Sequence, residues 1–325
     1  MTDNDHEEAK TDAGRLTVAR LTQPAEPFAP FTYPRFRPVL SHLSDGPVRV
    51  PDMPGTYEAV GAFDGGRPVG LALLQYPPDN VQGENDATRL LSIMVDIRLR
   101  RKGVGSSILA VAEDQARRAG VGLLVAQHSA QTKGRAAFEG LLASRDWSAP
   151  TLLEFRLSGH ADWTERVADQ WRPMLNRFRR QGYSSTPWAE ISETDRRDAQ
   201  ALVDEGLAYP LLDFSIFEPE MDPALSIALR QHGKLVGWVI GESLPTTGYH
   251  HYTCGYVCPA LQPSGWLIAG VYDVCVLQLA AYGAKSVAAY ETYGANTRMI
   301  NFMRRKLSDV TLWMDERYQS SKALG

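Results

Sequence analysis

The feature that most constrains the fold is a turn that occurs twice, each time between a predicted strand and a predicted helix. In the first half, Arg100-x-x-Gly103-x-Gly105 follows a strand ending at Val95 and opens a helix that reaches Arg118. Successive backbone N–H groups of such a turn point at one place beside the positive end of the helix dipole. Glycine lets an oxygen approach the main chain because it has no Cβ. The turn therefore predicts a site for a di-anion such as pyrophosphate.

The second half repeats the spacing of the first. Five positions separate Val95 from Arg100 and Val257 from Gln262, seventeen separate Gly103 from Gly120, and eighteen separate Gly265 from Gly283. Each half also has a hairpin signal, at Asp64-Gly65-Gly66 and at His232-Gly233-Lys234. Internal duplication is the simplest explanation, and 325 residues exceed the usual size of a single core.

The hydrophobic pattern predicts strands and helices in the same order in both halves. Predicted strands cover 15–21, 57–76 as a hairpin, 88–95, 121–127, 151–157, 188–191, 225–244 as a hairpin, 249–257 and 285–292. Predicted helices cover 103–118, 133–144, 162–181, 193–208, 265–283 and 296–307.

These elements define four segments. A polar, acidic arm at 1–14 is expected to be disordered. An N-terminal domain at 15–158 and a C-terminal domain at 184–325 flank a linker helix at 159–183. The linker carries an apolar side, Trp163, Val167, Trp171, Met174, Leu175 and Phe178, which is expected to clamp the two halves together.

Composition excludes several classes of protein. Hydrophobic residues make up 44% and charged residues 22%, which is typical of a globular chain. A net charge of −4 argues against nucleic-acid binding. No apolar run approaches the roughly 18 residues that span a bilayer, and no signal-peptide core is present, so a cytoplasmic protein without a membrane partner is expected.

The three cysteines, Cys254, Cys258 and Cys275, lie within one short region. An odd number of cysteines in a cytoplasmic chain favours buried thiols over disulfides. Cys-x3-Cys by itself supplies too few ligands for zinc. His250 and His251 are nearby, but core packing is favoured over a metal site.

Arg100-Arg101-Lys102-Gly103-Val104-Gly105, set in the order hairpin, strand, turn, helix, strand and helix, resembles motif A of the GNAT superfamily of acyl-CoA-dependent N-acyltransferases. The resemblance covers nearly the whole chain as two GNAT-like units in tandem. It implies an α/β (mixed α+β) class, in which each unit is a mostly antiparallel twisted sheet with splayed central strands flanked by helices. The pantetheine arm of coenzyme A would enter the splay and the acceptor amine would arrive from the other side.

The resemblance implies acetyl-CoA or another acyl-CoA as co-substrate, with no metal. It assigns coenzyme A binding to Val95, Arg100, Arg101, Lys102, Gly103, Val104, Gly105 and Ser106, and to Asn296. In the second half Gln262 and Gly265 match motif A, but Pro263 removes an N–H donor and Trp266-Leu267 adds bulk. Asn296-Thr-Arg-Met-Ile-Asn-Phe302 resembles the motif B helix, where the first half has Thr132 in the place of the asparagine.

Three side chains are candidates for proton transfer in such a reaction. The strand 88–95 carries no carboxylate where the family often places its base, and Glu139 or Met303 stands where the family often has a tyrosine that serves as the acid. His128 is the best base candidate of the first half, and His251 with Glu291 would flank the splay of the second. The alternative interpretation of each of the three is a core or surface residue that takes no part in catalysis.

The turn is neither a P-loop nor a Rossmann fingerprint, because the residue types and glycine spacing differ. The leading hypothesis is an N-acyltransferase, foremost an N-acetyltransferase, acting on the amine of a small molecule or peptide. One alternative is a catalytically silent acyl-CoA-binding sensor or partner protein. A second, within the enzyme class, is a longer-chain acyl donor with the C-terminal unit catalytic.

Overall fold

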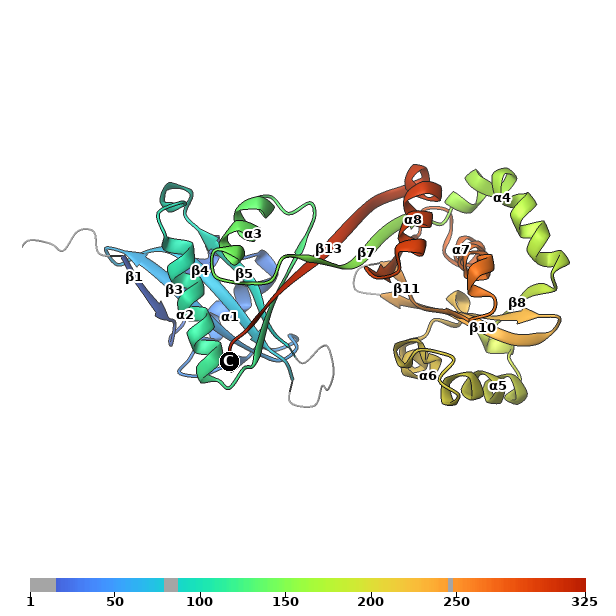
Figure 1. The fold of residues 1–325 in the computed structure, drawn as a ribbon, viewed down its shortest axis with the longest axis horizontal. Coiled ribbons are helices and arrows are strands. Elements are labelled where there is room, and N and C mark those ends of the chain that lie inside the picture. Colours follow the sequence, from blue (N-terminus) through green and yellow to red (C-terminus); the bar gives the residue numbers. More distant parts are fainter. Residues whose placement is uncertain (1–15, 79–86, 245–247) are drawn as a thin grey trace, which may run out of the picture. The chain divides into compact units, whose positions relative to one another are not determined.

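The computed structural model describes residues 16–78, 87–244 and 248–325, so the predicted arm at 1–14 lies outside the described residues. The chain divides into two compact units (Figure 1). Of the described residues, unit 1 comprises 16–78, 87–151 and 317–325, and unit 2 comprises 152–244 and 248–316. The chain passes from unit 1 to unit 2 at residue 151 and returns at residue 317.

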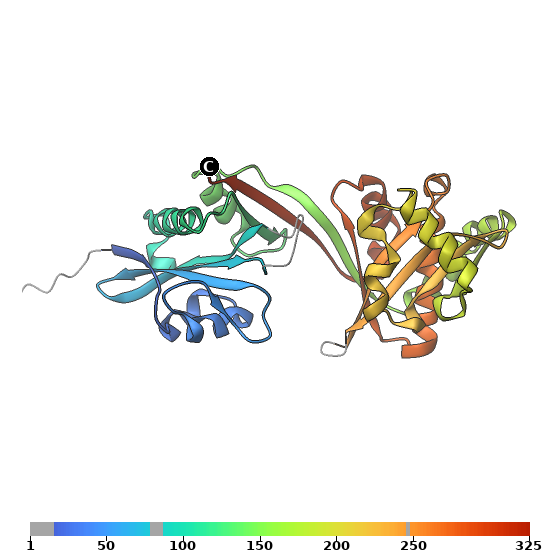
Figure 2. The ribbon, with the colours of Figure 1, turned by 90° about the horizontal axis from the view of Figure 1, so that it is seen from below.

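The sheet of unit 1 has the order β1-β3-β4-β5-β6-β13, with β2 beside β3. Its strands are β1 (Leu16–Arg20), β2 (Val48–Arg49), β3 (Thr56–Asp64), β4 (Arg67–Tyr76), β5 (Thr88–Val95), β6 (Leu123–Ser129) and the end of β13 (Thr311–Ala323). Its helices are α1 (Arg37–His42), α2 (Val104–Arg118) and α3 (Arg135–Ala143). Figure 2 shows α2 on one side of this sheet and α1 on the other, and each side has its own apolar core.

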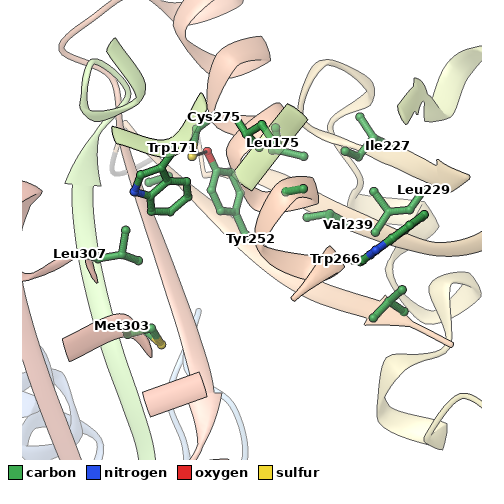
Figure 3. Close-up of a cluster of buried hydrophobic side chains, with 14 of the residues drawn as sticks. Trp171, Leu175, Ile227, Leu229, Val239, Tyr252, Trp266, Cys275, Met303 and Leu307 are labelled. Atoms are coloured by element: carbon green, nitrogen blue, oxygen red, sulfur yellow. Dashed lines mark hydrogen bonds between the residues drawn. The ribbon is translucent and has the colours of Figure 1, made fainter. Parts of the chain in front are cut away.

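The sheet of unit 2 has the order β7-β12-β11-β10-β9-β8, and β13 also neighbours β7. Its strands are β7 (Thr151–His160), β8 (Tyr183–Pro187), β9 (Ile227–Gln231), β10 (Lys234–Leu244), β11 (Tyr249–Val257) and β12 (Val287–Tyr293). Its helices are α4 (Trp163–Arg180), α5 (Glu193–Asp204), α6 (Phe214–Phe217), α7 (Trp266–Tyr282) and α8 (Thr297–Lys306). The core on the side of α4 and α7 is drawn in Figure 3.

Both units have the predicted splay between two central strands. In unit 1, β5 and β6 are parallel neighbours only as far as the pair Leu90 and Ala126. In unit 2, the parallel pairing of β11 and β12 ends at Tyr252 and Tyr290. The fold class predicted from the sequence, two mixed α/β units with mostly antiparallel sheets, is therefore confirmed.

A β-bulge lies beside each splay and was not predicted. The register between β4 and β5 shifts at Leu73 and Leu74, which leaves one extra residue, Leu91, on β5. The register between β10 and β11 shifts at Ile240 and Glu242, again with the extra residue on the splayed strand. Bulges bend a strand and leave a residue outside the ladder, and they are common next to active sites.

The structure corrects the predicted domain boundaries of 15–158 and 184–325. The strand predicted at 151–157 does not close the first sheet, because β7 pairs antiparallel with β12, with Leu157 opposite Tyr290. The place beside β6 is taken by β13, which had no predicted counterpart, with Tyr318 opposite His128. The final strand of each unit thus comes from the other half of the sequence.

The predicted linker helix is present as α4, but it belongs to unit 2. Its buried residues, Trp163, Val167, Trp171, Leu175 and Phe178, lie in one core with α7. The Trp163 indole N–H donates to Cys275 Sγ at 3.1 Å, and the two residues are held by adjacent helices. The strand predicted at 188–191 is displaced as well: β8 ends at Pro187, because the buried Trp188 begins a 3-10 turn.

Glu113 on α2 anchors the end of the chain to unit 1. Its carboxylate is 1% exposed and accepts hydrogen bonds from Arg145 Nη2 at 2.7 Å, Lys322 Nζ at 2.8 Å and Trp147 Nε1 at 2.8 Å. Burial disfavours the charge, but these three donors hold the pKa of Glu113 below its usual value. The network connects α2, the segment after α3 and β13.

Glu113→Gln should lower the free energy of unfolding by about 3 kcal/mol, because it leaves two cations without their shared buried carboxylate. Asp114→Asn is the matched control, since Asp114 pairs with Arg117 while both side chains are about half exposed. That change should cost less than about 1 kcal/mol. Urea denaturation of both variants measures the difference, and equal losses would contradict the anchoring role.

Candidate functional site

The turn before α2 is closed onto the end of β5. Arg100 Nε donates to the carbonyl oxygen of Val95 at 3.1 Å, so the first side chain of the motif braces the loop. Gly103 precedes α2 with a φ of +83°, a left-handed conformation that favours glycine. No described side chain caps α2, and the first backbone bond to Gly103 comes from Ser107. The N–H groups of residues 104 to 106 therefore lack a helical partner.

Three cations surround this helix end. Arg100, Arg101 and Lys102 are exposed, and within the described ranges none of them forms an ion pair with a carboxylate. Arg101 has a φ of +64°, which is costly for a residue with a Cβ. Left-handed non-glycine residues collect at ligand sites, where the surrounding structure maintains the strain. The turn thus offers N–H donors and unpaired positive charge to an anion.

Gly105 sets how much room this turn has. A Cβ built on Gly105 would lie 3.5 Å from Leu141 Cδ2 and 3.8 Å from Val95 Cγ2, which is ordinary contact. Alanine therefore fits, whereas a large side chain has to project beyond these neighbours. Val104 is buried beneath the turn and Ser106 is partly buried.

The corresponding turn of unit 2 has the same frame and a different lining. Gln262 Nε2 donates to the carbonyl oxygen of Val257 at 3.1 Å, as Arg100 does to Val95, and Gly265 also has a φ of +83°. The segment 258–266 contains no lysine or arginine. Pro263 lacks an N–H, and its carbonyl oxygen accepts a hydrogen bond from the Arg298 guanidinium.

Two large side chains, Trp266 and Leu267, occupy the corresponding turn of unit 2. Trp266 is 1% exposed and lies in the core beside Leu229 and Val239 (Figure 3). Leu267, at the position of Gly105, packs against Gly255, whose ideal Cβ would be 3.1 Å from Leu267 Cδ1. The residues of unit 1 fit a phosphate group, and those of unit 2 fit it poorly.

Asn296 acts as the N-cap of α8. Its Oδ1 accepts from the N–H of Met299 at 3.2 Å, and its Nδ2 donates to Thr292 Oγ1 at 3.2 Å. The backbone N–H of Asn296 bonds the carbonyl of Tyr293. Thr132 makes the same backbone bond to Ser129 in unit 1, so the two positions correspond as the motif comparison predicts. Both ends of the Asn296 side chain are engaged locally.

His128 lies on β6, just beyond the last parallel pair with β5. Its side chain is 3% exposed, and its Nε2 lies 2.8 Å from Glu139 Oε1. The same oxygen accepts from Arg135 Nε at 2.7 Å, and this bond holds the pKa of Glu139 below its usual value. His128 Nδ1 is buried and has no hydrogen-bond partner among the described residues.

The structure brings His251 and Glu291 together, as their assignment to adjacent strands predicts. His251 Nε2 lies 3.9 Å from Glu291 Oε2, and Arg156 Nε lies 3.3 Å from the same oxygen. Glu242 on β10 stands opposite His251, and burial raises the pKa of its carboxyl. These four residues form a polar row across β10, β11, β12 and β7.

Sequence reasoning missed Glu242 and Arg156. The signal that could have found Glu242 is the hairpin 225–244, whose antiparallel pairing to β11 places it beside His251. Counted from the last parallel pair of each unit, Gln75, Arg89 and Gln127 occupy the positions of Glu242, His251 and Glu291 in unit 1. The row of unit 1 therefore lacks carboxylates at these three positions.

The three cysteines are free thiols; Cys254 and Cys275 are buried as expected, and Cys258 is partly exposed. Within the described ranges, no three His, Cys, Asp or Glu residues are grouped so that they could hold a metal ion. Of the helices that the structure describes, none has both the length and the apolar character needed to cross a membrane.

A family model matches part of the sequence of unit 1. Residues 25–139 match the family model described as Acetyltransferase (GNAT) family. No curated protein sequence matches the chain.

Solved structures extend the fold over nearly the whole chain. A tandem GNAT protein from the clavulanic acid biosynthesis pathway is 15% identical with a TM-score of 0.52, covering 96% of this chain and 99% of that one. A GCN5-related N-acetyltransferase from Sphaerobacter thermophilus is 16% identical with a TM-score of 0.52, covering 82% of this chain and 80% of that one. A glucosamine N-acetyltransferase region of a fungal β-N-acetylglucosaminidase is 14% identical with a TM-score of 0.57, covering 94% of this chain and 38% of that one. The chain therefore has the fold of a tandem GNAT protein.

His250, next to His251, generates a prediction about pH. It is 7% exposed, and its Nδ1 lies 2.9 Å from Ser243 Oγ, which also bonds Asp222. Burial lowers the pKa of His250, so the folded imidazole stays neutral while the unfolded one titrates near about 6.5. The free energy of unfolding should therefore fall as pH drops below about 6.5, because the unfolded state takes up the proton first. His250→Gln should flatten this dependence.

Urea midpoints of the wild type and His250→Gln between pH 7.5 and 5 measure the effect. Parallel curves for the two proteins would contradict the assignment of the pH dependence to His250.

Proposed function

We propose that this chain is an N-acyltransferase that takes its acyl group from an acyl-CoA, foremost acetyl-CoA, and transfers it to the amine of a small molecule or peptide. The observation that carries the proposal is the turn before α2. It combines partnerless N–H groups, three exposed cations and two left-handed residues within the matched GNAT family domain. These are the donors and charges that a pyrophosphate requires.

In this proposal unit 1 holds the donor. The N–H groups of Val104, Gly105 and Ser106 would donate to the phosphates, and Arg101 and Lys102 would supply positive charge. Arg100 Nε donates to the Val95 carbonyl and so fixes the loop, while its other guanidinium N–H groups have no partner among the described residues. The splay beyond Leu90 and Ala126 provides backbone groups without strand partners for the pantetheine arm.

Transfer to an amine requires one proton to leave the nitrogen as the C–N bond forms and the C–S bond breaks. A positioned base contributes about 10²- to 10⁴-fold to such a step. In unit 1 the candidate is His128 at its partnerless Nδ1. In unit 2 the candidates are His251 and Glu291, which lie on one face of their sheet.

A catalytically silent acyl-CoA-binding protein is the second candidate function. It is favoured by the row of Gln75, Arg89 and Gln127 in unit 1, which offers no carboxylate to a reacting amine. The remaining alternative, a longer-chain donor bound by unit 2, is disfavoured by Pro263, Trp266 and the absence of cations from the 258–266 loop.

Coenzyme A should bind the wild type and Gly105→Ala, while Gly105→Trp should bind at least about tenfold more weakly, because the indole fills the space at the turn. Calorimetry measures the affinities, and circular dichroism checks that both variants are folded. Gly105→Ala is the matched control, since its Cβ meets only ordinary contacts. Unchanged affinity in a folded Gly105→Trp protein would refute this site.

Thiol release from acetyl-CoA with a panel of amines tests for turnover and locates the base. We expect a loss in kcat/KM of about 10²-fold or more, which is about 3 kcal/mol, for the variant that removes the true base. The variants are His128→Ala, His251→Ala and Glu291→Gln, each with coenzyme A affinity measured in parallel.

A loss confined to His128→Ala would place the chemistry in unit 1. Losses in His251→Ala or Glu291→Gln with intact coenzyme A binding would assign a role to unit 2. Coenzyme A binding by a wild type that turns over no amine would favour the silent alternative.

A further inference from the structure

A group of side chains contacts the ring of His128, and Glu139 is one of them. In the GNAT pattern a tyrosine is expected at the position of Glu139. We propose that Glu139 is a positioning residue: it holds His128 in the tautomer that carries its hydrogen on Nε2, so that Nδ1 is left to receive the proton of the acceptor amine. The inference rests on the proposed function for its chemical role.

The protonation of Glu139 is set by its partners. Arg135 lies one helical turn before Glu139 on α3, and its Nε donates to Oε1 at 2.7 Å. A carboxylate bound to a guanidinium is ionised and accepts hydrogen bonds only. His128 Nε2, 2.8 Å from the same oxygen, must therefore be the donor. In the neutral ring the hydrogen on Nε2 leaves a lone pair on Nδ1.

The imidazole ring is also fixed in orientation. The Phe138 ring meets it edge-on with centroids 5.5 Å apart, and the Tyr318 ring stacks at 5.9 Å with an interplanar angle of 21°. The Arg135 guanidinium lies 4.4 Å from the centroid of the Tyr318 ring. These contacts and the bond to Glu139 hold the ring from several directions, so Nε2 and Nδ1 do not exchange places.

The free atom of this ring is the unusual part of the arrangement. A buried acceptor without a donor is costly, and buried polar groups are seldom left so. Within the described ranges His128 Nδ1 is such an atom, and His128 itself lies just past the point where β5 and β6 part. An N–H group of a bound ligand would satisfy it.

The proposed step balances as follows. The amine nitrogen forms the C–N bond to the acyl carbon, its proton passes to Nδ1, and the electron pair of the C–S bond leaves on sulfur. The imidazolium that forms is stabilised by the Glu139 carboxylate at Nε2, and the thiolate takes up a proton from His128 or from water.

The first measurement is the ring tautomer, read from ¹⁵N shifts in the full chain labelled at histidine, with His128 assigned through His128→Gln. We expect the Nε2–H tautomer in the wild type. In Glu139→Gln the amide can donate to Nε2, so the population should shift toward Nδ1–H. Phe138→Leu is the matched control, since it removes a ring contact but keeps the carboxylate, and it should retain the wild-type tautomer.

The second measurement is kinetic. Glu139→Gln should lower kcat/KM by about tenfold or more, within the range of a general base, with coenzyme A affinity unchanged. A wild-type spectrum showing mainly Nδ1–H, or one that Glu139→Gln leaves unchanged, would overturn the proposal. A tautomer shift without any kinetic loss would overturn its catalytic part.

The spectroscopic and the kinetic measurements test this inference and the proposed function separately. A wild type without turnover would defeat the proposed function, while the spectra would still decide whether Glu139 sets the tautomer of His128.

Discussion

The structure of unit 1 depends on the pairing of β13 with β6. Arg317–Ala323 lies antiparallel to Ser129–Leu123, so strands almost two hundred positions apart in sequence share a ladder. Without it, β6 would be the edge of the sheet, with its backbone groups unpaired. Closing so long a loop costs conformational entropy, which the ladder and the buried carboxylate of Glu113 must offset. Unit 1 is therefore complete only when the end of the chain has docked.

The same pairing places a side chain beside the candidate base His128. Its register places Tyr318 opposite His128, and the two rings stack. A shift by one residue would turn Tyr318 to the other face of the sheet, because strand side chains alternate. The bonds of Lys322 to Glu113 and of Arg117 to the Leu324 carbonyl fix that register from the far end of the strand. The side chains that hold the ring of His128 thus come from α3 and from the chain end.

Much of the fold could be predicted from local signals, because turn glycines and apolar periodicity are short-range. The hairpin turns at Gly65-Gly66 and His232-Gly233 have positive φ at both central residues, as a tight hairpin turn requires. β13 escaped prediction because its sequence, from Asp315 to Lys322, is polar and shows no clear alternation. Its stability comes from a partner strand that no local window contains. Glu242 and Arg156 were missed for the same reason, since register and not spacing places them beside His251 and Glu291.

The two units share one backbone frame at the turn before α2 and α7, and they differ in the residues that line it. Both keep the brace from the motif side chain to the strand end and the left-handed glycine before the helix. Backbone geometry of this kind survives when the residues around it change, because it is part of the fold. An anion site depends on more than this backbone geometry, because it needs N–H donors and positive charges that are not already paired. At the corresponding positions unit 2 has Pro263, the buried Trp266 and a carbonyl bonded to Arg298. In its polar row unit 2 has the carboxylates of Glu242 and Glu291, at the two positions where unit 1 has the amides of Gln75 and Gln127. The two turns therefore share their backbone frame, while only the turn of unit 1 surrounds that frame with exposed cations.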